Sequence, residues 1–278
     1  QENIVNKEDN TNHKYVLIQL NEDINKKTEV FEECAKLERA YITNLTSWMQ
    51  LFKTNDHAPS YVDLYLNGKL LTDLVIPDDV SIIYAKTFLG NSSLKSVTIG
   101  KNVTEIEHDA FYSCYNLKHA TINGNIEIIG DNAFAYCPKL DTVEIGDNVR
   151  SIGSRVFESC SQLSTLKIGT GLTSIGRYSF MGCGNIKGVY IKELEAWCNI
   201  DFKPHVGYSL NNPLYGSNLY LNGKLVETLT IPDTVMTVSP YAFYNCSSIV
   251  SIKIPETVTS EELRATNDKL QVVSSHNS

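Results

Sequence analysis

The chain has 278 residues, which is enough for one large domain or two ordinary ones. It carries 24 basic and 32 acidic residues, a net charge of −8, and its Lys and Arg form no cluster, which argues against a nucleic-acid partner. No apolar run approaches the roughly 18 residues that span a bilayer, so we expect no transmembrane segment. The seven cysteines are an odd number, which argues against a fully paired disulfide framework.

The first 29 residues begin with the polar stretch QENIVNKEDNTN, without an initiator Met or an apolar signal core. This start is typical of a mature or trimmed N-terminus, and we expect that a targeting segment has been removed from it. The apolar stretch at 15–20 predicts that residues 1–29 form a cap or a degenerate first coil.

From residue 30 to residue 258 one motif recurs, for most of its length every 23 residues. A Phe is followed nine residues later by a small or branched apolar residue, and two residues after that by Ile. The regular units begin at Phe88, Phe111, Phe134, Phe157 and Phe180, with a further unit at Phe243. The frame also extends backward to a unit at Phe31, which places Cys34, Leu37, Ala40 and Ile42 in register. A repeat of this length falls in the leucine-rich range of about 20 to 29 residues.

Each V-x-I of the motif is a short alternating strand whose apolar pair faces inward. Nine such strand positions are present, at residues 40, 74, 97, 120, 143, 166, 189, 229 and 252. One coil cannot bury its own apolar edge, so the coils stack at about 4.8 Å, into a body on the order of 40 Å long. The glycines that end many units are expected to permit tight corners. The sequence therefore predicts an α/β, mostly β, leucine-rich-repeat solenoid of stacked 23-residue coils with short parallel strands.

Two longer coils interrupt the regular period, at 43–73 and 192–228. The sequence LYLNGKL occurs in both, at 64–70 and 219–225, after a short helical pattern that contains Trp48 or Trp197. Asn-Gly between alternating strands is a strong hairpin signal, because both residues accept a positive φ. We therefore expect a helix and a hairpin to be added at one edge of each long coil, and residues 259–278 to form a C-terminal cap or tail.

Six of the cysteines share one position of the repeat, which is occupied by Asn91 in the coil that starts at Phe88. They are Cys34, Cys114, Cys137, Cys160, Cys183 and Cys246. A zinc site needs four ligands around one point, and a stacked column is linear. A disulfide ladder fits the coil spacing by distance alone, but equivalent side chains point in parallel. We interpret these residues as reduced, buried hydrophobic groups.

Units of the form A-F-x-x-C-x-x-L-x-x-V-x-I, joined by I-P-D-x-V, resemble the BspA-type leucine-rich repeat proteins over residues 30 to 258. The interruption at 196–235 is also similar to elaborations in that family. The resemblance implies a curved solenoid, on or exported from the surface of host-associated bacteria and also found in some protozoan parasites. It further implies adhesion to host matrix proteins or other cells, and it supplies no catalytic motif.

A search for catalytic patterns finds no nucleophile elbow, zinc-protease motif, phosphate loop or dinucleotide fingerprint. No two histidines have metal-ligand spacing on an expected helix. Cys198 and His205 could suggest a nucleophile and a base, but Met49 replaces the thiol in the other long coil. We therefore expect no enzymatic activity, no metal and no cofactor.

The outward residues of the strands are the leading candidates for a binding face, because parallel strands of a solenoid form one continuous surface. They are Thr98, His119, Thr121, Thr142, Glu144, Thr165, Lys167, Tyr190 and Lys253. This polar, Thr-rich row suits a polar partner, but a solvent-facing β-surface also favours Thr without any binding role. The second candidates are tyrosines of the long coils, Tyr65, Tyr208, Tyr215 and Tyr220, which combine contact area with a polar tip.

The leading hypothesis is a secreted or surface-exposed, non-enzymatic module that binds a host or neighbouring-cell protein. A glycan-binding module that uses the tyrosines of the long coils is the second hypothesis, and a structural spacer or stalk is the third. Exposed aromatic residues around one groove would favour a glycan, and a flat polar strand face would favour a protein.

Overall fold

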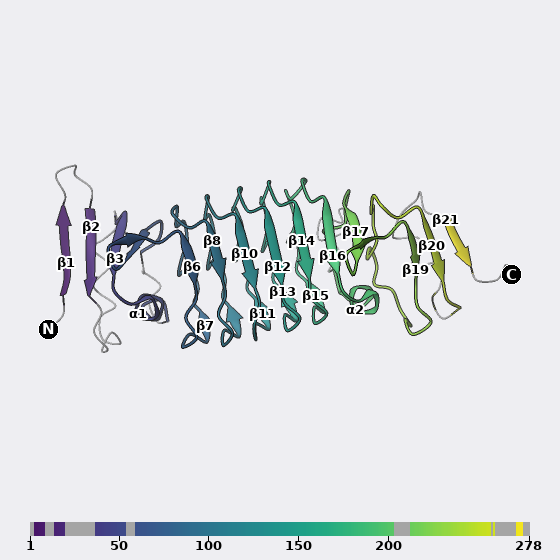
Figure 1. Cartoon of the computed structure of the whole chain (residues 1–278), viewed down its shortest axis with the longest axis horizontal. Coiled ribbons are helices and arrows are strands. Elements are labelled where there is room, and N and C mark those ends of the chain that lie inside the picture. The colour runs from purple at the N-terminus through teal and green to yellow at the C-terminus, as the bar shows by residue number, and fades with distance from the viewer. Residues whose placement is uncertain are drawn as a thin grey trace.

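The computed structural model describes residues 3–8, 14–19, 37–53, 59–202, 212–256, 258 and 271–274. The chain forms an elongated solenoid in which successive coils stand side by side along one axis (Figure 1). Leu37, Ala40 and Ile42 are buried as the repeat predicts. The earlier repeat positions Phe31 and Cys34 lie outside the described residues.

All nine predicted strand positions lie in strands. These strands are β3 (Arg39–Ile42), β6 (Asp73–Val75), β8 (Ser96–Thr98), β10 (His119–Ile122), β12 (Thr142–Ile145), β14 (Thr165–Ile168), β16 (Gly188–Ile191), β19 (Thr228–Thr230) and β20 (Ser251–Ile254). They alternate outward and buried residues, because the inward pair of each V-x-I reaches the core. The predicted solenoid of stacked coils with short parallel strands is therefore confirmed.

The strand side of the solenoid is divided into three sheets. Their orders are β1-β2-β3-β4-β5, then β18-β17-β16-β14-β12-β10-β8-β6, then β19-β20-β21. The remaining members are β1 (Asn3–Glu8), β2 (Lys14–Gln19), β4 (Asp63–Leu66), β5 (Lys69–Leu70), β17 (Asn218–Leu221), β18 (Lys224–Leu225) and β21 (Gln271–Ser274). The divisions fall at β5 and β18, because each returns antiparallel to its predecessor and occupies the edge that the next coil would otherwise pair with.

The expectation that each hairpin is only an addition at one edge was incomplete. The first strand of each hairpin pairs in parallel with the strand before it, β4 with β3 and β17 with β16. Each hairpin turn has positive φ at both central residues, 50° and 78° at Asn67 and Gly68, and 49° and 77° at Asn222 and Gly223. The proposed division into cap, solenoid and tail stays a prediction.

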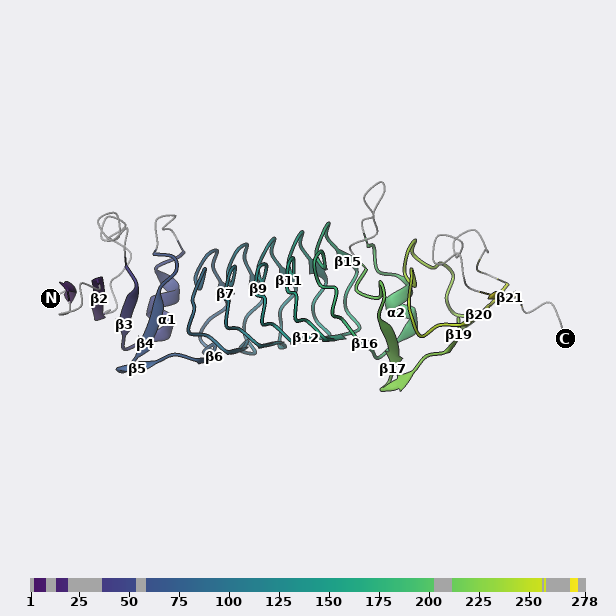
Figure 2. The ribbon, with the colours of Figure 1, turned by 90° about the horizontal axis from the view of Figure 1, so that it is seen from above.

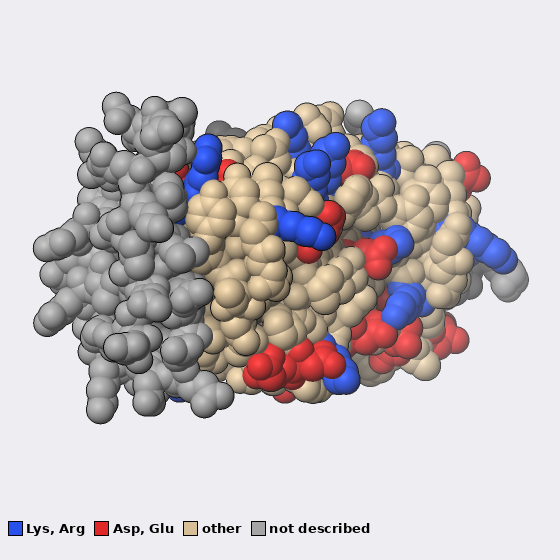
Figure 3. All heavy atoms as spheres, turned by 60° about the vertical axis from the view of Figure 1, so that its left-hand side comes forward, with Lys and Arg blue, Asp and Glu red and all other residues tan. Residues whose placement is uncertain are grey.

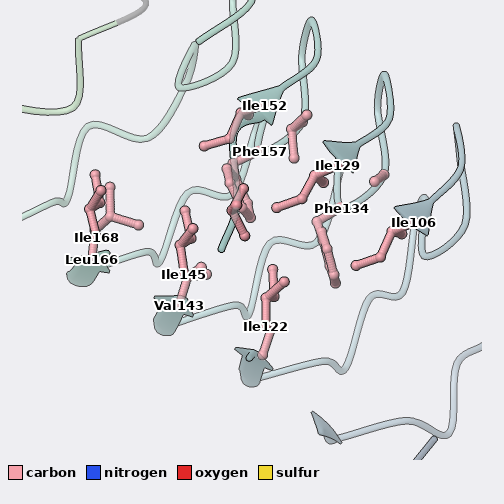
Figure 4. Packing of buried hydrophobic residues seen from close by; sticks show 14 of the residues in the cluster. Ile106, Ile122, Ile129, Phe134, Val143, Ile145, Ile152, Phe157, Leu166 and Ile168 are labelled. Carbon is pink, nitrogen blue, oxygen red and sulfur yellow. The ribbon is translucent and has the colours of Figure 1, made fainter. Parts of the chain in front are cut away.

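A fourth sheet forms the opposite wall of the core, across from the three sheets of the strand side. Its order is β15-β13-β11-β9-β7. These two-residue strands are β7 (Ile82–Ile83), β9 (Glu105–Ile106), β11 (Ile128–Ile129), β13 (Ser151–Ile152) and β15 (Ser174–Ile175). Their inward isoleucines face those of the strand side across the core, and Phe134 and Phe157 fill the space between them (Figure 4).

The repeated Phe residues form one continuous stack through the regular coils. The ring centroids of Phe111 and Phe134 are 4.9 Å apart, and those of Phe134 and Phe157 are 5.7 Å apart. The stack continues at 5.2 Å to Phe88 and at 5.5 Å to Phe180. A fixed position every 23 residues therefore becomes a column of rings in the core.

The repeat cysteines that the structure describes are free, buried thiols, namely Cys114, Cys137, Cys160, Cys183 and Cys246. In the regular coils each thiol donates to the carbonyl oxygen of the Phe one coil earlier, for example Cys137 Sγ to Phe111 O at 3.2 Å, whereas Cys246 Sγ donates to Ser217 O at 3.5 Å. Asn91 makes an equivalent bond, from Nδ2 to Val62 O at 2.8 Å. The interpretation of the described repeat cysteines as buried packing groups is confirmed.

Each long coil contains a short helix, α1 (Leu45–Gln50) or α2 (Leu194–Cys198). The indole Nε1 of Trp48 donates to Thr87 O at 3.4 Å, and that of Trp197 donates to Ala242 O at 2.9 Å. The two acceptors occupy the same repeat position, so each Trp supplies a hydrogen bond to the coil that follows.

The glycines at the ends of several strands have a role other than the expected corners. Gly146 and Gly169 do not have a positive φ. A Cβ on Gly169 would lie 2.5 Å from the carbonyl carbon and oxygen of Gly146. Glycine is needed at position 169 because the backbones of adjacent coils approach too closely there for a side chain, whereas a Cβ on Gly146 would lie 3.1 Å from Ile122 O.

Candidate binding face

The outward residues at the centres of the strands form one straight row. Backbone pairing places Val75, Thr98, Thr121, Glu144, Lys167, Tyr190 and Tyr220 directly beside one another. A parallel row comprises Asp73, Ser96, His119, Thr142, Thr165 and Gly188. We call the part of these two rows that lies on strands β6 to β16 the strand face; Tyr220 of β17 borders it at one end. The structure thus brings together eight of the nine predicted face residues.

The ninth predicted residue, Lys253, lies on β20 and pairs with Thr230 of β19. It therefore belongs to the sheet beyond the hairpin β17–β18. Of the predicted tyrosines, Tyr215 lies in the turn before β17 and stacks on Tyr244, with ring centroids 5.8 Å apart, so it is not in the row. Tyr208 lies outside the described residues.

Tyr220 joins the strand face through a stacked pair that sequence reasoning missed. Its ring lies 4.4 Å from that of Tyr190, at an interplanar angle of 11°. A Cβ on Gly188 would lie 2.9 Å from Tyr190 Cε2 and 3.1 Å from Tyr220 Cε2, so both rings lean over this glycine. The signal was present in the sequence, because Leu-Tyr-Leu has the same apolar-outward-apolar pattern as V-x-I.

The other long coil carries a matching pair. The rings of Tyr41 and Tyr65 stack at 4.6 Å and 25°. In both coils the return strand of the hairpin places a leucine next to the second tyrosine, Leu70 at 43% exposure and Leu225 at 45%. The duplicated sequence therefore produces two similar aromatic and apolar patches.

The two hairpins enclose the strand face. Seen from above, they project at either end of the row of strands β6 to β16 (Figure 2). Six strands at about 4.8 Å give the enclosed surface a length of roughly 24 Å. The strand face is therefore an open surface with one hairpin at each end.

A groove of about 430 Å³ runs along the edge of the strand face where the strands end. It crosses five successive coils, from Asn123 to the hairpin turn at Asn222 and Gly223. Three of the predicted face residues line it, namely Glu144, Lys167 and Tyr190. We call it the edge groove.

Two ion pairs cross the edge groove. Lys167 Nζ pairs with a Glu144 carboxylate oxygen on the neighbouring strand. Lys192 Nζ lies 2.8 Å and 2.6 Å from the two carboxylate oxygens of Asp147, two coils away. The hydrogen bond from Lys192, followed by the one from the Thr170 backbone N–H, keeps the pKa of Asp147 below its ordinary value, although desolvation opposes this.

A second hollow, of about 690 Å³, is lined by Glu105, Glu107, His108, Gly130, Asp131 and Asn132. It is open and acidic, and His108 Nδ1 lies 3.1 Å from Asp109 Oδ2. In the described part of the chain, no three His, Cys, Asp or Glu side chains gather as ligands of one metal ion would.

On the surface seen in Figure 3, both signs of charge are interspersed and acidic residues gather along the lower edge.

Cys198 has none of the properties of an activated nucleophile. Its side chain is buried, and burial together with the nearby Glu195 carboxylate raises the pKa of the thiol to about 12. A thiol with this pKa stays protonated at neutral pH, whereas thiol catalysis requires the thiolate. His205, its suggested partner, lies outside the described residues.

The coils, the buried Phe stack and the open strand face together define a leucine-rich-repeat solenoid of the kind that serves as a binding scaffold. The sequence profile described as the BspA type leucine rich repeat region matches residues 63–187 and 215–269 in six copies. This match covers more than half of the chain, and the chain belongs to the BspA-type leucine-rich repeat family. No protein with a curated description is significantly similar to it.

Three solved structures of leucine-rich repeat and vaccine-antigen proteins match this chain in part. The pneumococcal vaccine antigen PcpA is 15% identical, with 86% of this chain and 66% of PcpA covered and a TM-score of 0.46. A leucine-rich repeat protein of Bacteroides ovatus is 19% identical, with 74% and 60% covered and a TM-score of 0.36. One of Eubacterium ventriosum is 22% identical, with 68% and 61% covered and a TM-score of 0.38. The chain spans less than two thirds of the length of each.

The family and the fold indicate an interaction scaffold, and neither supplies catalytic machinery. Within the described residues, no helix combines the length and hydropathy needed to span a membrane.

Proposed function

We propose that this chain is a surface-exposed or secreted adhesion module whose strand face binds a protein of the host matrix or of a neighbouring cell. The observation that carries the proposal is the alignment of outward side chains on six paired strands between two hairpins. The strand face therefore offers a partner a large, fixed contact surface that loses little conformational entropy on binding.

The chemistry of the strand face suits a protein surface rather than a strongly charged polymer. Thr98 and Thr121 are neighbours in its outward row, and Glu144 and Lys167 neutralise each other. The exposed Val75 at one end and the tyrosine pair at the other provide apolar contact area. Aromatic anchors beside polar residues are the usual composition of protein interfaces.

Glycan recognition is the second candidate function. The observation that favours it is the stacked pair Tyr190 and Tyr220 beside the polar edge groove. An aromatic surface next to hydrogen-bonding groups suits a sugar, because a sugar has both apolar C–H surfaces and hydroxyl groups.

The protein-binding proposal is tested by surface plasmon resonance against immobilised fibronectin, laminin, collagen and fibrinogen at physiological salt. The variant Thr121→Arg places a long charged side chain at the centre of the strand face. The control Ile128→Arg introduces the same group at an exposed position on β11 of the opposite sheet. We expect one of these proteins to bind, with affinity at least tenfold lower for Thr121→Arg and unchanged for Ile128→Arg. Failure of all four to bind, or equal effects of both variants, would contradict the proposal.

A further inference from the structure

The edge groove is shaped by a hairpin turn and by glycines, and a run of regular coils alone would not form it. Its wall at one end is the turn Asn222 and Gly223, which exists only because the long coil inserts a hairpin there. Its floor includes Gly146 and Gly169, where neighbouring backbones approach closely: a Cβ would lie 3.1 Å from Ile122 O at Gly146 and 2.5 Å from Gly146 O at Gly169. A hollow therefore remains between the ends of the strands and the hairpin.

The charges along the edge groove cancel. Glu144 and Asp147 are its only acidic lining residues among those the structure describes, and Lys167 and Lys192 are the only basic ones. Each ammonium group is paired with a carboxylate, so the groove offers no excess charge to a phosphate, a sulfate or a cation. Its electrostatics fit a neutral, polar ligand.

The pairs also present hydrogen-bond donors next to acceptors. The carboxylate of Asp147 accepts from Lys192 Nζ and from the Thr170 backbone N–H at 3.1 Å, and it retains further lone pairs. The ammonium of Lys192 retains further donors. Two neighbouring hydroxyl groups can therefore bind one pair, one donating to the carboxylate and the other accepting from the ammonium.

The remaining lining adds a long shape and an aromatic surface. Five successive coils at about 4.8 Å make the groove roughly 19 Å long, and its volume of about 430 Å³ is within the range of ligand sites. Tyr190 supplies an aromatic side chain, while Asn123 and Asn222 supply amide groups at the two ends. A linear chain of neutral sugars has the matching combination of length, apolar C–H surfaces and vicinal hydroxyl groups.

We propose that the edge groove is a binding site for a neutral linear oligosaccharide, with Asp147, Lys192 and Tyr190 as its principal contacts. This inference rests on the second candidate function, glycan recognition, and it names the site and the class of sugar. It is independent of Thr98 and Thr121, which lie on the strand face but do not line the groove.

The test is NMR titration of the folded chain with maltohexaose, cellohexaose, laminarihexaose and chitohexaose, beside a heparin-derived hexasaccharide as the anionic comparison. We expect a neutral hexasaccharide to shift the amide signals of Gly146 and Gly169 and to leave those of Thr98 and Thr121 in place. Binding through a charged hydrogen bond predicts that Asp147→Asn weakens affinity about tenfold or more, and Tyr190→Ala should weaken it similarly.

The matched control is Asp78→Asn. This residue forms the same kind of exposed ion pair, with Lys101 Nζ at 2.8 Å, but it does not line the groove. Its affinity for the sugar should be unchanged. The inference is overturned if no neutral sugar shifts the groove amides at concentrations up to about 10 mM, if only the anionic sugar does, or if Asp147→Asn binds as well as Asp78→Asn. Protein binding that is lost in Thr121→Arg would survive any of these results, so the two proposals fail separately.

Discussion

The Phe stack makes a quantitative prediction about how stability is distributed along the solenoid. Phe134 is fully buried at the centre of the stack, with a ring on either side. Phe180 is the last ring of the stack, 6% exposed, and it stacks on Phe157. Truncation to Ala at these two positions removes the same atoms but a different number of ring contacts.

Removing a buried Phe side chain costs about 3 to 5 kcal/mol through lost transfer free energy and the cavity that remains. Each ring contact contributes about 0.5 to 1.5 kcal/mol beyond its buried area. We therefore expect Phe134→Ala to lower the free energy of unfolding by about 3 to 5 kcal/mol, and Phe180→Ala to lower it by roughly 1 kcal/mol less.

The assay is equilibrium unfolding in urea, followed by far-UV circular dichroism and by tryptophan fluorescence. Trp48 and Trp197 are the two tryptophans of the chain, and they are buried in the long coils on either side of the Phe stack. Coincident midpoints from the two signals would indicate one cooperative unit. Equal losses for the two variants, or a larger loss for Phe180→Ala, would refute the additive account of the stack.

Two further predictions concern glycine and cysteine positions. Gly169→Ala should destabilise the chain by about 1 to 3 kcal/mol, because the new Cβ would meet the backbone of Gly146. Gly184→Ala, where nothing lies within 4 Å, should change stability by less than about 0.5 kcal/mol, and similar urea midpoints for both variants would contradict the close-approach explanation. The raised pKa of Cys198, about 12 against an ordinary 9.0, predicts stability that is complete below pH 9.0 and lost as the pH rises toward 12, because only the unfolded thiol ionises in that range. Cys198→Ala should therefore lose less stability than the original chain between about pH 9 and pH 11, and a parallel decline in both proteins would count against this reasoning.

The repeat could be predicted from the sequence because each coil uses the same local pattern. An inward Val and Ile, followed by a Phe turn, place nine strands without knowledge of distant contacts. The first strands of the two hairpins escaped because Leu64 and Leu219 were interpreted as hairpin residues, although their pattern matches the other strands. The division into three sheets escaped for a related reason, since it depends on which edge the return strand occupies.

The edge groove could not be predicted in the same way. Lys192 and Asp147 are 45 residues apart, and their contact depends on how far a side chain reaches across an intervening coil. The absence of side chains at Gly146 and Gly169 matters only because a hairpin stands at one end of the groove. The predicted residues Glu144, Lys167 and Tyr190 were found by their outward register, which is a local property, whereas the hollow that joins them is not.

The central claim, adhesion through the strand face, is tested most directly by a competition measurement under flow. Beads coated with the chain are passed over the matrix protein to which it binds, and soluble variants compete for attachment. The account predicts that Ile128→Arg inhibits attachment as well as the original chain does, whereas Thr121→Arg fails to inhibit it. Equal inhibition by Thr121→Arg would show that attachment does not use the strand face, and would contradict the account.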